Sequence, residues 1–311
     1  MESTSKQIIS VIIVTCARRD YLDPCLRSLR PQQGVDLEII VINNASDERS
    51  SREIADSFKG IALYSFRENL LYCQALNFGI AKSRGEYVLC LNDDVVLDEN
   101  YISQAWKGFF KDKKVGMVSG KLMRADKKTL DSTGLFLSYW RTARERGYGK
   151  PDRGQFEKPE YVFGVNGAAA FYSRAMLESI KEGGEYFDSR FGIFYEDLDV
   201  SWRAQRKGWL GFYVPSAVAY HIRGGTVRSA EGVNRPFARR YLNEDLFRDL
   251  VKNRYLTLIK NESFLGFLLH LPGILFYECL SWAHIMFFRP GFIKKEVFRV
   301  IAAAFDRRRK R

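Results

Sequence analysis

The sequence predicts an α/β fold with a doubly wound, mostly parallel sheet that helices cover on both faces. Up to about residue 119, short β-rich runs alternate with amphipathic helical stretches, which is typical of β-α-β units. Several of these runs are apolar throughout, as strands buried on both faces tend to be. With 46% hydrophobic and 28% charged residues in 311, the composition excludes a largely disordered or collagen-like chain.

The first half is expected to contain five strands and four helices. Helix-start signals at Asp20, Asp47 and Asp98 support the helices. In such a sheet, ligands bind at the carboxyl ends of the strands. The expected strands are Ile8–Thr15, Leu37–Ile42, Ile61–Phe66, Glu86–Leu91 and Val115–Ser119, and the expected helices are Asp20–Leu29, Ser50–Phe58, Leu70–Ser83 and Glu99–Lys111.

The second half begins with a less regular stretch, Lys121–Phe163, which we interpret as a long excursion that covers the substrate. Regular structure is then expected to return. The expected elements are a buried run over Gly167–Ser173, a helix from Arg174, a helix over Glu196–Lys207, strands over Gly211–Val214 and Ala217–His221, and a helix over about Arg239–Lys260. We therefore expect one α/β domain over residues 1–260.

Residues 261–311 form a C-terminal segment of different composition. Ser263–Phe288 is aromatic and carries one formal charge, Glu278, but polar residues, Pro272 and a glycine interrupt it. A single span would put the basic tail and the enzyme on opposite sides of a membrane, against the preference of Lys and Arg for the cytosolic face. We expect a broken or in-plane membrane-associating segment held on anionic lipid by that tail. The alternative is a core helical hairpin with a solvated tail.

The charge distribution argues against a nucleic-acid-binding protein, and the cysteines argue against a disulfide-rich or zinc-binding one. The net charge is +12, of which Met286–Arg311 contributes +7 (nine basic, two acidic), so a nucleic-acid groove across the fold is not indicated. The five scattered cysteines contain no C-x-x-C pair, which argues against a disulfide framework and a zinc site. The start is polar, and Ile8–Val14 is too short for a signal-peptide core. We expect an intracellular enzyme.

Three groups of residues are candidates for chemistry. Asn92, Asp93 and Asp94 directly follow an expected strand, where a divalent cation would join carboxylates to a nucleotide's phosphates; a capped turn is the alternative. Glu196 and Asp197 open a helix after an aromatic run that would desolvate a catalytic base. Complementing the helix dipole is their alternative role. His221 ends a strand and could complete a metal shell, although a lone histidine is usually structural.

The motifs taken in order carry a family resemblance. They are SVIIVTCARRDYLDPCLRSL, EIIVINNAS, ENLLYCQALNFGIAKSRGEYVLCLNDDVVL, VGMVSGKLM, NGAAAFYSRAMLESI, EYFDSRFGIFYEDLDVSWRAQRKGW, VPSAVAYH and KNRY. Over roughly Ile8 to Lys260 the chain resembles family 2 inverting glycosyltransferases with the GT-A fold, in the branch that includes bacterial rhamnosyltransferases of cell-surface polysaccharide assembly. The ordered set is far more specific than any one motif.

The resemblance implies that residues 1–260 form a catalytic domain with a nucleotide half (about 1–120) and an acceptor half (about 160–260), and it assigns a role to each motif residue. It implies that Asp197 is the general base with Glu196 beside it in the acceptor site, and that Asp94, Asp93 and His221 hold Mg²⁺ or Mn²⁺. Three departures stand out: Asn43 replaces a common aspartate, Asn92 opens the acidic triplet, and Leu70 replaces a glycine. The residues implied to line the donor site are Thr15, Asn43, Asn44, Asn69, Asn92, Asp93, Gly167 and Ala168.

The implied reaction moves a sugar from a nucleotide-diphospho-sugar, with dTDP-rhamnose or a UDP-sugar favoured, to a saccharide or polyprenyl-diphosphate-linked acceptor. It would take place at the cytoplasmic face of the inner membrane, on an anionic surface. A sugar-phosphate nucleotidyltransferase is the nearest rival, but TCARRD is a poor match to its glycine-rich basic loop. A non-catalytic membrane-docked nucleotide- or polysaccharide-binding protein is a second alternative. A nucleic-acid binder is disfavoured, and the oligomeric state is left open, with a homodimer as one option.

Overall fold

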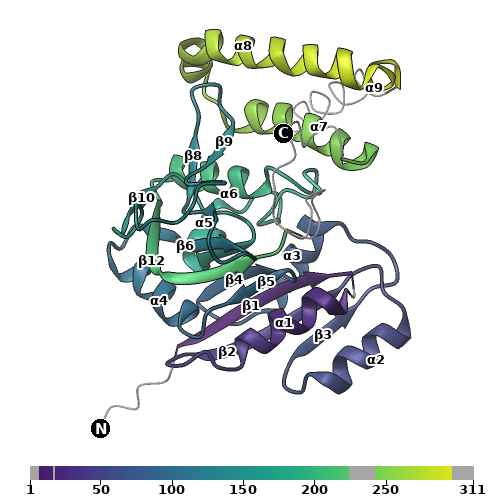
Figure 1. Ribbon diagram of the computed structural model, residues 1–311, viewed down its shortest axis with the longest axis vertical. Helices are drawn as coiled ribbons and strands as arrows, with labels where there is room; N and C mark the ends of the chain where they lie inside the picture. Colours follow the sequence, from purple (N-terminus) through teal and green to yellow (C-terminus); the bar gives the residue numbers. More distant parts are fainter. Residues whose placement is uncertain (1–6, 17, 224–241, 296–311) are drawn as a thin grey trace.

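The computed structural model describes residues 7–16, 18–223 and 242–295, and it contains a ten-stranded mixed sheet with helices on both faces (Figure 1). The strand order is β10-β12-β6-β11-β4-β1-β2-β3. Most pairs along this path are parallel, whereas β11 runs antiparallel to both of its neighbours and β10 runs antiparallel to β12. The predicted α/β class is confirmed.

The first half follows the prediction closely. All of its predicted elements are present, with β5 and a short 3₁₀ turn (Gly108–Phe110) in addition. The third helix begins two residues later than expected, at Tyr72, because Leu71 adopts a positive φ of 61° that ends the preceding turn. The elements are β1 (Ile8–Thr15), α1 (Arg19–Leu29), β2 (Asp36–Asn43), α2 (Glu48–Ser57), β3 (Ala62–Ser65), α3 (Tyr72–Lys82), β4 (Tyr87–Asn92), β5 (Val95–Leu97) and α4 (Tyr101–Lys107).

The main correction concerns Lys121–Phe163, which was predicted to be irregular but contains regular strands. The strand β6 (Val115–Arg124) continues five residues beyond its expected end, and the rest of the excursion forms four strands of three residues each: β7 (Leu130–Ser132), β8 (Leu135–Leu137), β9 (Ala143–Glu145) and β10 (Glu160–Val162). Strands of this length carry too few residues for a period-2 pattern to register in the sequence. The antiparallel β8–β9 hairpin rises from the sheet toward the C-terminal helices (Figure 1).

The remaining elements complete the sheet and cover it. The two strands predicted around Pro215 form one strand, β12 (Leu210–His221), with a register shift between Val214 and Val218, where a residue without an N–H is tolerated. Part of the helix expected over Arg239–Lys260 lies outside the described residues. The other elements are β11 (Ala169–Ser173), α5 (Arg174–Ile180), α6 (Glu196–Arg206), α7 (Glu244–Asn261), α8 (Phe264–Phe288) and α9 (Pro290–Lys295).

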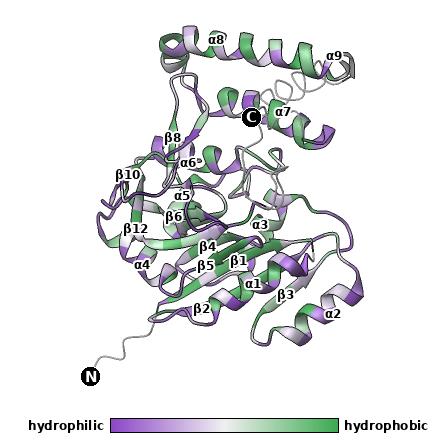
Figure 2. Cartoon of the chain, in the orientation of Figure 1, coloured by the Kyte–Doolittle hydropathy of each residue, from purple (hydrophilic) through white to green (hydrophobic). Residues whose placement is uncertain are grey.

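Two hydrophobic cores lie on opposite faces of the sheet. Alternate residues of β1 contribute to each: Val11 and Ile13 to the core that includes α1 and α4, and Ile12 to the core that includes α3, α5 and α6. All three side chains are fully buried. This two-sided burial explains why the central strands are apolar throughout, a pattern that is visible in Figure 2.

Residues 264–288 form one continuous helix, α8, so a segment broken within this range and the alternative of a core hairpin are wrong, while the in-plane form stays a prediction. A proline inside a helix costs about 3 kcal/mol, and tertiary contacts offset this cost. Gly273 packs so closely on Tyr139 of the β8–β9 hairpin that an added Cβ would lie 2.5 Å from the ring. By length and composition α8 could span a membrane, and only 11% of its most apolar window is buried.

Candidate active site

The carboxyl ends of β1, β2 and β4 bring the predicted donor-site residues together. Thr15 ends β1, and its hydroxyl donates a hydrogen bond to Asp93 Oδ2 at 2.7 Å. Asn92 ends β4, and its Oδ1 accepts a hydrogen bond from the Tyr72 hydroxyl at 2.7 Å. The expected juxtaposition at this edge of the sheet is present.

The asparagines after β2 and β3 shape the loop that leads into α3. Asn44 Nδ2 donates to Asn69 Oδ1 at 2.9 Å, and Asn44 Oδ1 accepts from the Leu70 N–H at 2.8 Å. These bonds let the chain turn without a glycine, with the positive φ falling on Leu71. Asn43 is fully buried; its amide donates to Ser51, and its Oδ1 lacks a partner among the described residues.

His221 lies beside Asp94, as the strand-end prediction requires. The Ile222 N–H donates to the Asp94 carbonyl at 3.0 Å. This backbone contact brings the two side chains together, with His221 Nε2 3.3 Å from Asp94 Oδ1. His221 Nδ1 lies 2.8 Å from Asp131 Oδ2, and Asp131 also pairs with Arg223. Sequence reasoning missed Asp131, because it lies in a three-residue strand 90 positions away from its partner.

The charges of this group set its protonation. Burial lowers the pKa of His221, but hydrogen bonds and charges from Asp131 and Asp94 outweigh it and raise this pKa to about 9. Burial raises the pKa of Asp131, and His221 with Arg223 outweighs it, giving a pKa of about 2. Burial raises the pKa of Asp93 to about 6, although the Thr15 hydroxyl opposes the shift.

The donor set of this group fits a divalent cation. In the neutral form that binds metals, His221 would donate Nδ1–H to Asp131 and present the lone pair of Nε2 on the side of Asp94, the usual arrangement of a carboxylate-oriented metal-binding histidine. No group of three His, Cys, Asp or Glu side chains ready to hold a metal occurs in the described part of the chain. A cation here would have two protein ligands and open positions for diphosphate oxygens. Asp93 is bonded to Thr15, and its role as a ligand stays a prediction.

Glu196 and Asp197 open α6 after two residues, Phe194 and Tyr195, with positive φ. Burial, and then the charge of Asp197, raise the pKa of Glu196. Burial also raises the pKa of Asp197, but N–H groups of Gly167 and Leu198 oppose the shift by donating to its two oxygens at 3.0 and 2.7 Å. These donors favour ionised Asp197, so it is the better candidate for the base.

The turn 166–168 joins the two halves of the site. The Gly167 N–H donates to Asp197, and the carbonyl of the following residue, Ala168, accepts from the Asn92 N–H at 2.9 Å. Asn166 Oδ1 closes the turn by accepting from the Ala168 N–H at 2.8 Å. One short segment therefore contacts both the acidic triplet and the residue predicted to be the base.

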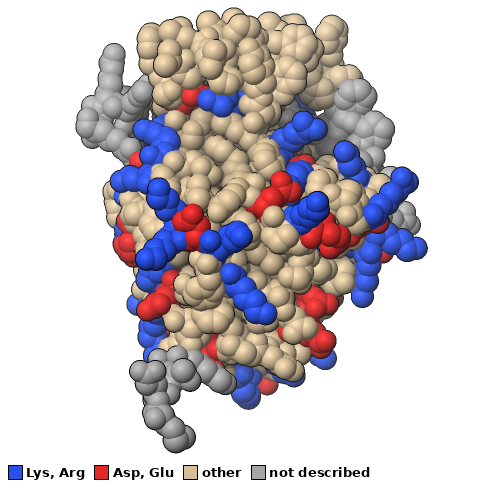
Figure 3. Space-filling model, turned by 90° about the vertical axis from the view of Figure 1, so that its left-hand side faces the viewer, with Lys and Arg blue, Asp and Glu red and all other residues tan. Residues whose placement is uncertain are grey.

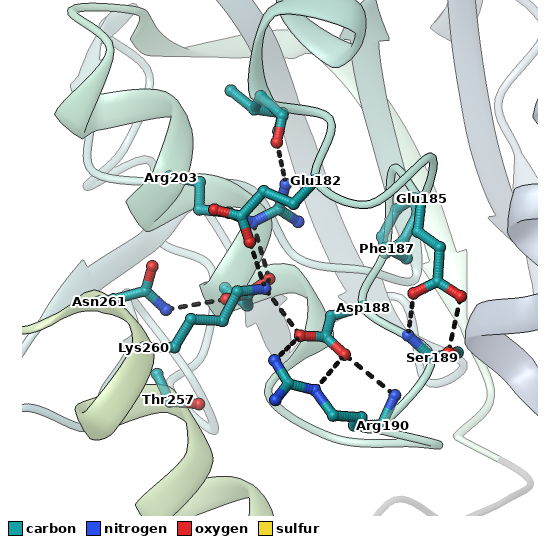
Figure 4. A network of polar contacts seen from close by, with 12 residues as sticks. Glu182, Glu185, Phe187, Asp188, Ser189, Arg190, Arg203, Thr257, Lys260 and Asn261 are labelled. Atoms are coloured by element: carbon teal, nitrogen blue, oxygen red, sulfur yellow. Dashed lines mark hydrogen bonds and ion pairs between the residues drawn. The ribbon is translucent and has the colours of Figure 1, made fainter. Parts of the chain in front are cut away.

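A buried polar network fixes α6 to α7 (Figure 4). Asp199, one turn after the site carboxylates, accepts hydrogen bonds from Arg203 Nε and Lys260 Nζ, both at 2.9 Å, and from Asn261 Nδ2 at 2.8 Å. Lys260 also lies 3.0 Å from Asp188. Sequence reasoning missed this network, since its members come from three separate segments.

Residues 10–181, more than half of the chain, match the family model described as glycosyl transferase family 2. The chain belongs to this family of glycosyltransferases, as the ordered motifs indicated. The rhamnosyltransferase branch is not tested by this match.

Curated relatives are similar over much of the chain. A poly-beta-1,6-N-acetyl-D-glucosamine synthase of Staphylococcus epidermidis strain RP62A is 23% identical over 70% of this chain and 51% of the relative. Another synthase of that name from Staphylococcus epidermidis is 23% identical over 91% of this chain and 70% of the relative. Against the first of these, the chain spans about half the relative's length.

Solved structures share the fold. GalNAc-T7 with UDP, GalNAc and Mn²⁺ superposes with a TM-score of 0.59 and 14% identity, covering 82% of this chain and 48% of that one. The mannosyltransferase PcManGT from Pyrobaculum calidifontis, in complex with GDP-Man and Mn²⁺, gives a TM-score of 0.57 and 16% identity over 96% and 79%. Staphylococcus aureus TarS gives 0.56 and 14% over 94% and 46%. At these identities the likeness shows the GT-A fold alone.

Proposed function

We propose that this protein is a metal-dependent inverting glycosyltransferase, which moves a sugar from a nucleotide-diphospho-sugar to a hydroxyl of a saccharide or lipid-linked saccharide in surface polysaccharide synthesis. The observation that carries the proposal is the turn 166–168, which contacts Asn92 of the acidic triplet on one side and Asp197 on the other. A donor's anomeric carbon held at this turn would have the leaving diphosphate near Asp94 and the attacking hydroxyl near the base.

Asp197 takes the proton of the acceptor hydroxyl as its oxygen attacks the anomeric carbon. The bond from that carbon to the diphosphate oxygen breaks in the same displacement, and the configuration inverts because no covalent intermediate forms. Protonated Glu196, buried beside Asp197, adds no second negative charge where the acceptor hydroxyl binds.

A divalent cation, Mg²⁺ or Mn²⁺, would be held by Asp94 and His221, with Asp93 as a further candidate, and would stabilise charge on the departing diphosphate. Asp131 orients His221 for this role. Mn²⁺ accompanies the ligands of two structural neighbours, which supports a divalent cation without choosing between the two metals.

The donor nucleotide would contact Thr15, Asn43, Asn44 and Asn69 at the ends of the first three strands. The buried, unpartnered Oδ1 of Asn43 is available to an N–H of a pyrimidine base. We retain dTDP-rhamnose or a UDP-sugar as the favoured donor; two structural neighbours, GalNAc-T7 and PcManGT, are bound to UDP and GDP-Man.

We propose that α8 lies in the interface of an anionic membrane surface, the cytoplasmic leaflet of the inner membrane, where a polyprenyl-diphosphate-linked acceptor is presented. Its outward side chains include Phe264, Leu265 and Phe287, each more than three-quarters exposed. On its inner side, Glu278 accepts from Arg254 Nε at 3.1 Å and from the Tyr255 hydroxyl at 2.6 Å. These contacts hold α8 along α7, across one end of the molecule, and a transmembrane orientation would have to break them (Figure 1).

The basic surface near α8 supports this orientation. On the face that Figure 3 shows, Lys and Arg side chains, with some Asp and Glu among them, lie below an end of the molecule where no charged side chain is visible. Basic groups beside an apolar face are typical of a protein that lies on anionic lipid. The basic residues beyond 295 lie outside the described residues.

The experiment that tests the reaction is turnover of dTDP-rhamnose, UDP-N-acetylglucosamine and GDP-mannose with Mn²⁺ or Mg²⁺, followed by NMR of the released sugar or product anomer. Cation-dependent turnover of one donor with inversion supports the proposal. Retention of configuration, or turnover unaffected by a chelator, would contradict it.

A further inference from the structure

Glu145 is a partly buried residue whose carboxyl oxygen Oε2 is inaccessible to solvent, and the reaction outlined above does not use it. It ends β9 and pairs with Leu135 of β8, and Leu135 in turn exchanges two backbone hydrogen bonds with Gly164 at 2.9 and 3.2 Å. This register brings Glu145 to the start of the turn 166–168, where Asn166 Nδ2 donates to its Oε1.

Two carboxyl groups contact the turn 166–168. Glu145 binds the side chain of Asn166, while Asp197 binds the N–H of the next residue, Gly167. Burial, and then the charge of Asp197, raise the pKa of Glu145 to about 7, while the Ser132 hydroxyl and Arg223 oppose the shift. The charge of Asp197 therefore acts on Glu145, and both carboxyl groups contact the segment that we expect to contact the donor sugar.

The second oxygen of Glu145 is available to a ligand. Oε2 is buried and has no well-formed hydrogen-bond partner among the described residues. A buried polar atom in this state costs on the order of 1–3 kcal/mol, and such an atom at a binding site is commonly satisfied by the ligand. Sugar hydroxyls are the donors that a nucleotide-sugar would bring here.

The hairpin that carries Glu145 is held at its other end. Arg254 Nη2 donates to the Trp140 carbonyl at 2.7 Å, and Arg141 forms an ion pair with Glu262 at 2.5 Å, between α7 and α8. Strand pairing fixes one end of the hairpin, and a hydrogen bond and an ion pair fix the other end. Glu145 therefore has little freedom to move toward another partner.

We propose that Glu145 binds a hydroxyl of the transferred sugar through Oε2 and so distinguishes the nucleotide-sugar from the bare nucleotide. This inference rests on the proposed function. The donor sugar, rather than the acceptor, is favoured because Glu145 contacts Asn166 of the turn 166–168, whose Ala168 carbonyl also binds Asn92 of the acidic triplet.

The test is calorimetric binding of UDP, UDP-N-acetylglucosamine, dTDP, dTDP-rhamnose, GDP and GDP-mannose, with Mn²⁺, to the wild type and Glu145→Gln. The amide keeps an oxygen for Asn166, so the turn should persist. For the preferred donor we expect Glu145→Gln to weaken binding roughly 10- to 100-fold, as for a hydrogen bond to a charged group, and to change binding of the matching nucleotide less than twofold. Glu160→Gln, an exposed carboxyl in the same excursion, is the matched control and should change neither.

A second measurement uses deoxy analogues of the preferred donor with the wild-type protein. One analogue, which lacks the hydroxyl that Glu145 binds, should bind about as weakly to the wild type as to Glu145→Gln. Equal loss of nucleotide and nucleotide-sugar binding, or an unchanged ratio between them, overturns the role of Glu145 alone. A wild type that binds none of the six ligands overturns the donor assignment itself.

Discussion

Side chains from distant parts of the chain form the site, and the sequence identified those with a positional signal. Asp94, His221 and Asp197 each lie near the end of a strand or the start of a helix, so position made them candidates, and the family resemblance supplied their proposed roles. Asp131 and Glu145 were missed, because each lies in a three-residue strand and acts through a partner far away in the sequence.

Asp197→Asn removes the proposed base but keeps the size of the side chain and one oxygen for a backbone N–H. We expect turnover to fall roughly 10²- to 10⁴-fold while donor binding changes little. Steady-state kinetics together with calorimetry separate these effects, with Asp245→Asn on the exposed start of α7 as the control. Near-normal turnover in Asp197→Asn would rule out the assignment.

The carboxyl group of Asp197 determines the expected pH dependence of turnover. The base must be ionised, and burial raises the pKa of Asp197, so turnover should be full above the raised pKa and fall as the pH drops through it. The midpoint of the kcat profile should therefore lie above the ordinary aspartate pKa of 3.8. A profile flat down to pH 4 would contradict this expectation.

Asp131→Asn tests the support of the proposed metal ligand. Loss of the carboxylate that orients His221 should weaken Mn²⁺ binding roughly 10- to 100-fold in the presence of nucleotide. Paramagnetic resonance of bound Mn²⁺ measures this directly, and Asp126→Asn, in the exposed turn before β7, serves as the control. Unchanged affinity would show that His221 does not bind the metal through this arrangement.

At the scale of elements, period and length decided what the sequence could predict. Runs such as β1 and β4 are long enough for their burial on both faces to register. The four short strands around the hairpin were read as an irregular stretch for the opposite reason, and α8 stays helical through Pro272 because tertiary contacts, which no local pattern encodes, hold it in place.

The network around Asp199 gives a prediction for the helix that carries the base. Lys260→Met removes one of the two cations bound to buried Asp199, which keeps Arg203, and the loss of such a charged hydrogen bond costs about 1.5–3 kcal/mol. Urea unfolding should reveal a loss of unfolding free energy of this order. Lys252→Met, at the partly exposed pair with Asp249 on α7, should change it by less than about 1 kcal/mol. Equal stabilities of the two variants would show that the network does not anchor α6.

At the scale of the molecule, the apolar helix α8 and the active site are connected, because the β8–β9 hairpin extends from the turn 166–168 to α8 (Figure 1). The separate domains that the sequence predicted, residues 1–260 and 261–311, remain a proposal. Composition predicted a membrane-associating segment, but not that a hairpin would link it to the catalytic residues.

Membrane association has its own test. Deletion of the residues after Asn261 should release the enzyme from vesicles that contain anionic phospholipid, because it removes both α8 and the basic tail. The double variant Leu265→Glu and Leu268→Glu, on the exposed face of α8, should also bind weakly while retaining soluble donor binding. Sedimentation with vesicles measures both, and equal partitioning of wild type and truncated protein would contradict the proposal.

The most direct test of the central claim is thermal unfolding of detergent-solubilised protein with UDP, dTDP or GDP, each with and without Mn²⁺ or Mg²⁺, in the wild type and Asp94→Ala. A nucleotide at about 100 times its dissociation constant adds roughly 2.7 kcal/mol of stability, a shift of a few degrees. The account predicts a shift for one nucleotide class that requires the cation and disappears in Asp94→Ala. A shift that persists without a cation or in Asp94→Ala, or no shift with any nucleotide, would contradict it.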